Sequence, residues 1–251
     1  MPFFNSAGVR IHYQERGDGA PVILVHGFGL HAKSHWEDTG LVDFLAARYR
    51  VIAPDARGHG HSDKPHTAEH YGMRNMCGDI IRLLDHLAIQ RTLAVGYSMG
   101  SRVCLSLIME HPQRFRAVVL GGFGSTGAIS LPGQRAKISA ALLAHDPATI
   151  ADEVPRRFRN SLEASANDLK ALAACISAEE ETPDLTGAPP ITLPVLLLTG
   201  GRDRIAGDPR PLVGSFGNAR VELLDGIGHV RAPSERAFHA AIANFFAHAP
   251  D

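Results

Sequence analysis

Ser98 is the candidate nucleophile of this 251-residue chain. It lies in the sequence Gly-Tyr-Ser-Met-Gly of residues 96–100, and no other serine has glycine both two residues before and two residues after it. A serine hydroxyl is a weak nucleophile that needs an adjacent base, itself oriented by an acid. His229, which follows a glycine near the C-terminus, and Asp203, in a Gly-Gly-Arg-Asp sequence, could supply these groups. The three residues together predict acyl transfer through a covalent intermediate.

Each of these assignments is weak when it is taken alone. A glycine-rich turn could hold an incidental serine, one histidine among 14 could be an ordinary loop residue, and Asp203 could simply form a turn. The positions of the three residues add weight, because each follows a predicted strand and they run in the order serine, aspartate, histidine. Parallel sheets bind their ligands beyond the carboxyl ends of the strands.

Short apolar runs alternate with helical patterns along most of the chain. Continuous apolar runs predict buried strands, and apolar residues three and four positions apart predict helices. Strands are expected at 9–13, 21–25, 49–53, 91–95, 117–120, 193–198 and 219–224, and helices at 76–87, 101–110 and 234–247. Strands joined by helices of this length imply right-handed crossovers and a mainly parallel sheet covered on both faces.

Residues 123–190 break this alternation. They contain helical patterns at 136–143, 150–158 and 167–176 but no convincing strand. We therefore expect an α/β core formed by residues 1–122 and 191–251, with residues 123–190 as a helical insertion.

A second loop is expected to complete the site. Residues 26–29, His-Gly-Phe-Gly, directly follow the predicted strand at 21–25. Acyl transfer needs two donors aimed at the oxygen that becomes negatively charged. The backbone N–H groups of Phe28 and of Met99, the residue after the nucleophile, could form this oxyanion hole. The side chain of His26 is expected to hold the loop in place.

With these motifs the sequence resembles the α/β-hydrolase family over essentially its whole length. The matching segments are residues 26–29, 55–63 (Asp-Ala-Arg-Gly-His-Gly-His-Ser-Asp), 96–100, 201–203 and 228–229. The resemblance implies an eight-stranded, mostly parallel sheet with helices on both faces and a helical cap inserted after the sixth strand. Some members carry the acid directly after that strand, but residues 121–124 hold no carboxylate here, which favours Asp203.

The loop at residues 59–63 also permits a different interpretation. His-Gly-His-Ser-Asp is part of a dinuclear zinc signature, and histidine is a good zinc ligand. Lys64, however, stands where that signature has a further histidine, and the resemblance implies structural roles for Arg57 and Asp63. We expect neither a metal nor an organic cofactor.

Other polar residues near these segments are expected to be peripheral. His31 and His35 are predicted to lie at the surface or the rim of the site. Arg156, Arg157 and Arg159 of the insertion are predicted to lie on solvated helix faces, with binding of a substrate carboxylate as the alternative. The aliphatic side chains of the insertion are expected to pack together and, where they face Ser98, to line an apolar pocket.

Composition and charge exclude several functional classes. Lys and Arg (25) nearly balance Asp and Glu (26), which argues against a general electrostatic grip on nucleic acid or anionic membranes. No apolar run reaches the ~18 residues of a membrane span, and the first residues do not resemble an export signal. Three scattered cysteines suit a reducing cytoplasm. We expect a cytoplasmic protein that acts on a small molecule, and the sequence leaves its oligomeric state open.

The predicted activity is hydrolysis of carboxylic esters of small to medium, largely apolar substrates through an acyl-enzyme. Hydrolysis of lactones (enol-lactones among them) or of carbon–carbon bonds, and cofactor-free perhydrolysis, could use the same three residues. The family's dehalogenases and epoxide hydrolases use an aspartate where this chain has Ser98, and its carbon–carbon bond hydrolases often have Trp where it has Val230. A non-catalytic small-molecule receptor is a further alternative, since fold alone does not fix function.

Overall fold

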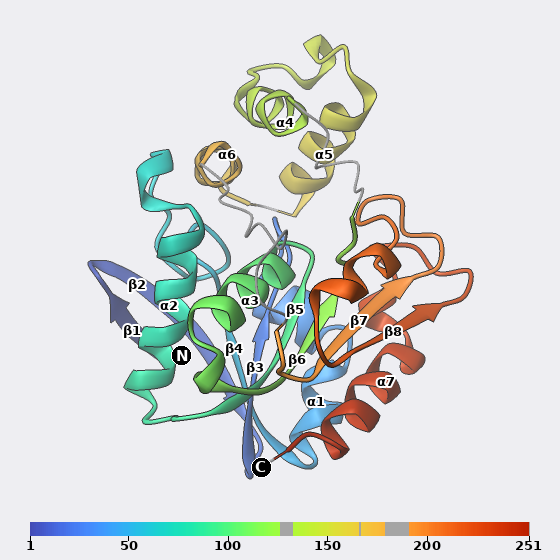
Figure 1. Cartoon of the computed structure of the whole chain (residues 1–251). Coiled ribbons are helices and arrows are strands. Elements are labelled where there is room, and N and C mark those ends of the chain that lie inside the picture. The colour runs from blue at the N-terminus through green and yellow to red at the C-terminus, as the bar shows by residue number, and fades with distance from the viewer. Residues whose placement is uncertain (126–132, 166, 179–190, 251) are drawn as a thin grey trace.

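The computed structural model describes residues 1–125, 133–165, 167–178 and 191–250. Its centre is an eight-stranded sheet in the order β1-β2-β4-β3-β5-β6-β7-β8 (Figure 1). Strands β3 to β8 run parallel to one another, whereas β2 pairs antiparallel with both β1 and β4. The strands are β1 Phe3–Ser6, β2 Val9–Arg16, β3 Ala20–Val25, β4 Tyr49–Pro54, β5 Thr92–Tyr97, β6 Phe115–Gly121, β7 Val195–Gly200 and β8 Ala219–Leu224. The prediction of an eight-stranded, mostly parallel sheet is confirmed.

Helices bury both faces of this sheet. On β3, Ile23 and Val25 face the apolar layer beneath α2 and α3, whereas Val22 and Leu24 face the layer beneath α1 and α7. Because both faces are buried, the central strands are continuous apolar runs in the sequence. The core helices are α1 Leu41–Ala46, α2 Met73–His86, α3 Met99–Glu110 and α7 Arg236–Ala247. Short 3₁₀ helices span Ala68–His70, Pro112–Arg114, Pro147–Thr149, Arg210–Ser215 and Ala232–Ser234, and a π-helical turn spans Lys33–Glu37.

Three further helices lie between β6 and β7 in the sequence. They are α4 Gln134–Leu143, α5 Glu153–Ala164 and α6 Leu169–Ser177. They gather beyond the carboxyl ends of the parallel strands, above the core in Figure 1, and pack on one another through Leu142, Leu162 and Leu172. Asn167, before α6, donates a hydrogen bond of 3.0 Å to the carbonyl oxygen of Gly29 in the core. The exact division into a core and a cap of residues 123–190 stays a prediction.

The sequence patterns did not predict two of the observed elements, and they placed the start of a third at the wrong residue. Strand β1 has only four residues and lies at the edge of the sheet, and α1 has only six, so neither provides a long enough pattern. Helix α5 begins at Glu153 rather than at residue 150, because Asp146 caps a 3₁₀ turn over Pro147–Thr149 and the chain re-enters a helix only after Asp152.

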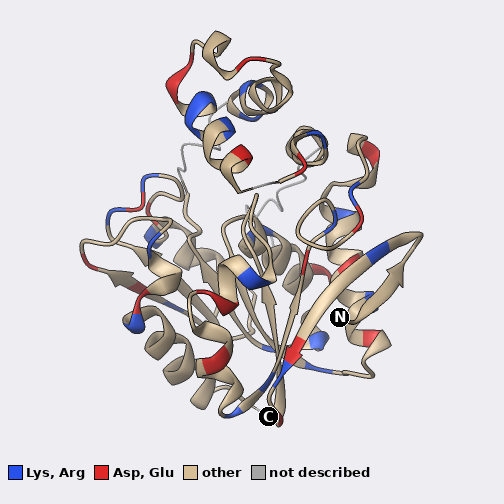
Figure 2. Ribbon diagram, turned by 180° about the vertical axis from the view of Figure 1, so that it is seen from behind, with Lys and Arg blue, Asp and Glu red and all other residues tan. Residues whose placement is uncertain are grey.

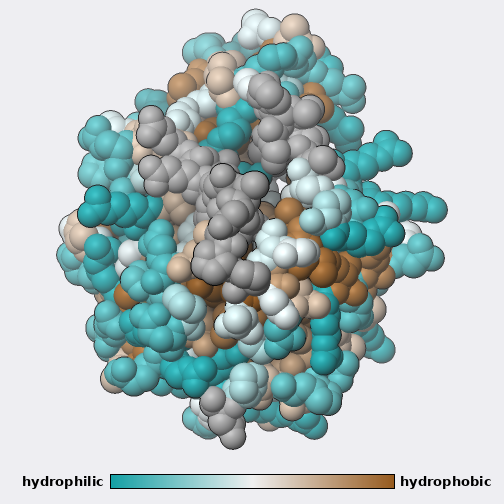
Figure 3. All heavy atoms as spheres, viewed as in Figure 1, coloured by the Kyte–Doolittle hydropathy of each residue, from teal (hydrophilic) through white to brown (hydrophobic). Residues whose placement is uncertain are grey.

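Charged and hydrophobic residues are distributed without a large bias. Acidic and basic residues are interspersed over the ribbon in Figure 2. On the face shown in Figure 3, hydrophilic residues dominate, and hydrophobic residues reach the surface between the three inserted helices and the core below them. Within the described part of the chain, no helix has both the length and the apolarity needed to span a membrane.

Candidate active site

Ser98 occupies a strained turn between a strand and a helix. Strand β5 ends at Tyr97 and α3 begins at Met99, so Ser98 alone makes the turn, with φ 53° and ψ −110°. A positive φ is uncommon for a residue with a side chain and persists only where the surroundings enforce it. Here the backbone N–H of Ser98 donates a hydrogen bond of 2.9 Å to the carbonyl oxygen of Gly121 on the neighbouring strand. The turn holds the serine at the carboxyl end of the sheet.

Two glycines allow the helix to start this close to the strands. A Cβ atom on Gly96 would lie 2.3 Å from the carbonyl oxygen of Gly100, and one on Gly100 would lie 2.0 Å from the carbonyl oxygen of Val25. Both contacts involve backbone atoms that cannot rotate away. The glycines that flank Ser98 in the sequence are therefore explained by packing.

Asp203 and His229 meet as the sequence predicted. Asp203 lies in the turn after β7 and His229 in the loop after β8, and Nδ1 of His229 is 2.6 Å from Oδ2 of Asp203. The carboxylate is fully buried, and its other oxygen accepts hydrogen bonds from the backbone N–H groups of Ile205 (2.9 Å) and Ala206 (2.8 Å). A carboxylate that accepts at Nδ1 leaves the proton on that nitrogen, so the lone pair of the neutral imidazole is on Nε2.

The imidazole of His229 lies against the strand that carries the serine. The hydroxyl of Tyr97 donates a hydrogen bond of 2.5 Å to the carbonyl oxygen of His229, and the two ring centroids are 5.1 Å apart. A Cβ atom on Gly122 would lie 2.9 Å from Cε1 of His229, which places the ring beside the end of β6. Among the described residues, the side chain of Ser98 makes no hydrogen bond. Such bonds are often long before substrate binds.

The two predicted oxyanion donors lie in the same pocket as Ser98. Phe28 and Met99 both line this pocket, and neither backbone N–H donates a hydrogen bond to another described residue. Met99 is the first residue of α3, where backbone N–H groups have no partner inside the helix. These two groups are available to a negatively charged oxygen.

Comparison with known proteins identifies the fold. A model of the alpha/beta hydrolase fold family matches residues 20–132. The enol-lactonase from Burkholderia xenovorans LB400 aligns with a TM-score of 0.82 over 98% of this chain and 100% of that one, at 23% sequence identity. The chain has the α/β-hydrolase fold. At this identity the structural match shows the shared fold.

Curated relatives of this α/β hydrolase carry several hydrolase names. It is 29% identical over 270 residues to a 2-hydroxymuconate semialdehyde hydrolase of Pseudomonas putida, covering 97% of this chain and 93% of the relative. It is 37% identical over 128 residues to the protein of that name from Pseudomonas sp. strain CF600, where the match spans 51% of this chain and only 44% of the relative. Proteins named as epoxide hydrolases and esterases are also similar to it.

Two buried histidines of this hydrolase hold the loop that carries Phe28. Nε2 of His26 accepts a hydrogen bond of 2.9 Å from the backbone N–H of Ala56, and its Nδ1 donates to the carbonyl oxygen of Gly27 (2.8 Å). Nδ1 of His35 accepts a hydrogen bond of 2.9 Å from the backbone N–H of Gly27. The prediction that His26 secures the loop is confirmed. The prediction that His35 lies at the surface or the rim is wrong, because it is 3% exposed and stacks on Trp36.

The polar side chains of the loop at residues 55–63, for which zinc binding was the alternative interpretation, contact other residues of the protein. Nδ1 of His59 donates to the carbonyl oxygen of Arg57 (3.0 Å), while Asp63 pairs with Arg10. Arg57 makes two hydrogen bonds of 2.7 Å to the buried carboxylate of Asp79. Within the described residues, no three His, Cys, Asp or Glu side chains come together as metal ligands.

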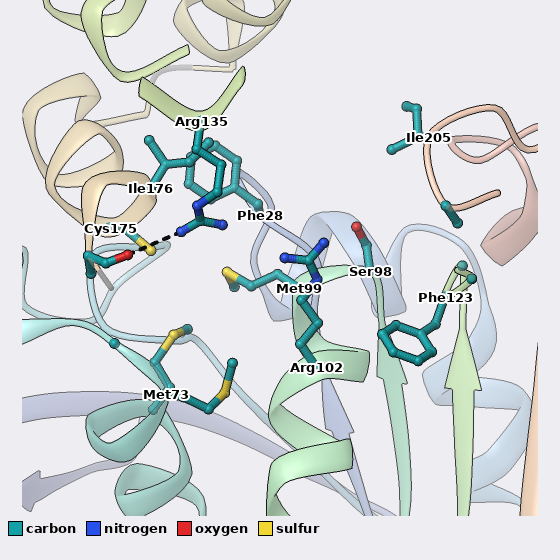
Figure 4. A pocket seen from close by; sticks show the side chains of 16 residues that line it. Phe28, Met73, Ser98, Met99, Arg102, Phe123, Arg135, Cys175, Ile176 and Ile205 are labelled. Carbon is teal, nitrogen blue, oxygen red and sulfur yellow. Dashed lines mark hydrogen bonds between the residues drawn. The ribbon is translucent and has the colours of Figure 1, made fainter. Parts of the chain in front are cut away.

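The sequence predicted that aliphatic side chains of the insertion would line the pocket, whereas the inserted helices contribute an arginine and a cysteine as well as an isoleucine. From the inserted helices it is lined by Arg135 of α4 and by Cys175 and Ile176 of α6, and from the core by residues that include Phe28, Ser98, Met99 and Arg102 (Figure 4). Arg102 was missed, although its position four residues after Ser98 places it on the same side of the helix as the serine.

The arginines considered from the sequence lie elsewhere. Arg157 is exposed beside Glu153, and Arg156 donates to the carbonyl oxygen of Ile150. The prediction that Arg159 lies on a solvated helix face is wrong, because this residue is only 6% exposed; it pairs with Glu163 of the same helix. None of the three is among the described residues that line the pocket.

We expect Gly100→Ala to destabilise the protein by about 1–3 kcal/mol, because the added methyl group would collide with the backbone of β3. Gly214→Ala is the matched control, since a Cβ atom there meets no described atom within 4 Å. It should change the free energy of unfolding by no more than about 0.5 kcal/mol. Urea unfolding measures both values, and equal losses in the two variants would contradict the packing explanation.

Stability should also fall on acidification from about pH 6.5. Burial lowers the pKa of His26 and His35, and lowers the pKa of His59 to about 3. At a pH between 6.5 and the pKa values of these histidines in the folded state, the unfolded chain binds protons that the folded chain does not. The free energy of unfolding therefore decreases as the pH falls through this range. In the folded state a proton on His26 or His35 would also replace the nitrogen lone pair that accepts the loop hydrogen bond.

Urea unfolding at pH 7, 6 and 5 tests this expectation. His59, whose pKa is lowered to about 3, should contribute up to roughly 1 kcal/mol per pH unit, and the lowered pKa values of His26 and His35 should add to the loss. His59→Gln should reduce the slope by about one histidine's share, since an amide does not titrate. A stability that is constant from pH 7 to 5 would contradict the assignment.

Proposed function

We propose that this α/β hydrolase cleaves carboxylic esters of small to medium, largely apolar substrates through an acyl-enzyme on Ser98. The observation that carries the proposal is the 2.6 Å hydrogen bond between Asp203 and His229, two residues from separate loops, at the sheet end where Ser98 forms its strained turn. A buried carboxylate that orients a histidine beside a serine turn is the arrangement that nucleophilic acyl transfer requires.

In the proposed first step, Nε2 of His229 accepts the proton of the Ser98 hydroxyl as the serine oxygen attacks the ester carbonyl. Asp203 keeps the proton of the neutral imidazole on Nδ1 and stabilises the imidazolium that forms. The imidazolium then protonates the leaving alcohol, which gives the acyl-enzyme. Water, deprotonated by the same histidine, attacks the acyl-enzyme and releases the acid.

The negative charge of the tetrahedral intermediates would be held by the backbone N–H groups of Phe28 and Met99. Donors that are already in place strengthen the interaction, because the protein does not reorganise as the charge develops. His26 and His35 contribute indirectly, since their hydrogen bonds fix the loop on which Phe28 lies.

Lactone or carbon–carbon bond hydrolysis is a second candidate on the same residues. The structural similarity to an enol-lactonase and the near full-length similarity to 2-hydroxymuconate semialdehyde hydrolase favour it. Val230, which follows the proposed base, is 86% exposed and offers no aromatic surface at this position. We therefore keep ester cleavage as the first proposal.

We further propose that residues 123–190 form a cap over the site and that the protein is cytoplasmic. Support for the cap comes from Cys175 and Ile176 of α6, which line the pocket opposite Ser98. Support for the compartment comes from the three cysteines, which are all buried and form no disulfide, as suits a reducing environment.

A panel of p-nitrophenyl esters, lactones and a vinylogous diketone tests the reaction class. We expect the highest kcat/KM on esters with short to medium acyl chains, because the walls from α4 and α6 limit the space above Ser98. Turnover of the diketone with little activity on any ester would replace ester cleavage by carbon–carbon bond cleavage. Binding of a panel member without turnover would favour a receptor.

Asp203→Asn should lower kcat by roughly 10³–10⁴-fold. The amide oxygen would accept the N–H groups of Ile205 and Ala206, and its NH₂ group would then face Nδ1 of His229 and leave the proton on Nε2, where it cannot accept from serine. Asp208→Asn and Asp225→Asn are matched controls: Asp208 bonds Arg210, and Asp225 is exposed. A larger loss in either control would show that another carboxylate serves as the acid.

A further inference from the structure

The loop that carries the proposed oxyanion donor Phe28 is held from two sides. On the core side, two buried histidines bind Gly27 through hydrogen bonds. On the other side, the ring of Phe28 packs on the apolar cluster of the inserted helices and lies beside Ile176 in Figure 4. A Cβ atom on Gly29 would lie 2.0 Å from Cδ2 of Leu162, so this leucine covers the glycine. The inserted helices therefore contact the part of the loop that follows Gly27.

Asn167, between α5 and α6, makes a polar contact with the same loop. Its side-chain nitrogen donates hydrogen bonds to the carbonyl oxygens of Gly29 (3.0 Å) and of Leu162 (3.2 Å). An amide NH₂ group has two hydrogens, so these two bonds use its full donor capacity. One planar amide thus links the last turn of α5 to the loop.

The carbonyl of Gly29 belongs to a series of hydrogen-bonded peptide groups that ends at the proposed donor. This carbonyl and the N–H of Leu30 are parts of one planar peptide group. The N–H of Leu30 donates a hydrogen bond of 3.3 Å to the carbonyl oxygen of Gly27. That carbonyl in turn shares a peptide plane with the N–H of Phe28. Two peptide planes therefore connect the amide of Asn167 to the direction of the Phe28 N–H.

The conformation of this turn needs support from outside the loop. The bond between Leu30 and Gly27 closes a four-residue turn over residues 27–30, in which Gly29 has φ 73°. Glycine adopts positive and negative φ about equally readily, so the residue itself does not enforce this value. The hydrogen bond from Asn167 and the covering side chain of Leu162 supply the enforcement.

We propose that Asn167 is a positioning residue of the oxyanion hole. By binding the carbonyl of Gly29, it keeps the peptide group between Gly27 and Phe28 in the orientation in which the Phe28 N–H meets the oxyanion. Hydrogen bonds in series also polarise one another, which strengthens the last donor. The inference rests on the proposed hydrolytic function and gives the inserted helices a part in the chemistry. Asn167 acts through the loop, since it is not among the described residues that line the pocket.

Steady-state kinetics of Asn167→Ala test this role on whichever member of the substrate panel the wild type turns over fastest. We expect kcat to fall by roughly 10- to 100-fold, a smaller loss than the 10²–10³-fold for outright removal of a donor. KM should stay within about 3-fold, because the donor binds the charge that develops in the transition state. Asn167→Asp keeps the size but loses both donors and turns a charge toward two carbonyl oxygens, so its loss should be at least as large.

Asn75→Ala is the matched control. The side-chain nitrogen of Asn75 also donates to two backbone carbonyl oxygens, those of Glu69 (3.0 Å) and Tyr71 (2.9 Å), which lie outside the turn at residues 27–30. The substitution removes the same side chain and the same number of hydrogen bonds. It should leave kcat within about 3-fold of the wild type. An equal loss of kcat in the two variants would overturn the proposal in favour of general loosening.

Amide hydrogen exchange reports on the turn without any substrate. The N–H of Leu30 should exchange faster by about 10-fold or more in Asn167→Ala, because local opening then breaks its bond to Gly27 more often. It should exchange at the wild-type rate in Asn75→Ala. Unchanged exchange of Leu30 in Asn167→Ala would overturn the proposal, and so would faster exchange with an unchanged kcat.

The two measurements separate failure of this inference from failure of the proposed function. An active wild type and an equally active Asn167→Ala would overturn the inference alone. A wild type that turns over no member of the panel would contradict the hydrolytic function and, with it, the effect of Asn167 on catalysis. The exchange of Leu30 would then decide whether Asn167 holds the turn.

Discussion

The close contact between the start of α3 and the carboxyl ends of β3 and β5 is the constraint on which the site depends. Gly96 and Gly100 permit it, since a Cβ atom at either position would overlap backbone. The turn that remains forces Ser98 to a positive φ and leaves the N–H of Met99 without a partner among the described residues. This packing contact therefore fixes the direction of the serine side chain and leaves the N–H of Met99, a proposed oxyanion donor, accessible. It also fixes the position of Arg102, which lies one helical turn after Ser98.

The second proposed donor depends on buried histidines rather than on regular structure. Phe28 lies in a loop, and the buried backbone N–H and C=O groups of such a loop need hydrogen-bond partners. These hydrogen bonds also hold the loop in one position beside the proposed site of charge development. His26 and His35 do this as neutral hydrogen-bond partners of Gly27 and Ala56. Burial keeps their pKa values below that of a free histidine, so the loop is held by groups that stay uncharged at neutral pH.

Much of the core could be predicted from the sequence because its strands are buried on both faces and thus stand out as apolar runs. Asp203 and His229 could be paired in advance because parallel strands bring their carboxyl ends to one edge, and the structure joins them. The roles of Ser98, Asp203, His229, Phe28 and Met99 stay predictions. Short elements such as β1 and α1 give too little periodicity to be recognised.

Burial and pocket lining were harder to predict, because they depend on contacts between distant segments. His35 is polar and lies in a loop sequence, yet the stacked ring of Trp36 and the approach of Gly27 enclose it. Arg102 could have been found from its spacing to Ser98. Arg135 could not, since its place in the wall depends on how α4 and α6 pack over the core.

The covalent intermediate on Ser98 is the central claim, and rapid-quench mass spectrometry with p-nitrophenyl acetate tests it most directly. The account predicts that the intact protein gains the mass of one acetyl group during turnover. Peptide mapping should place that group on Ser98, and Ser98→Ala should gain none and release no p-nitrophenol above the background rate. Acetylation at another residue, or turnover that persists in Ser98→Ala, would contradict the account.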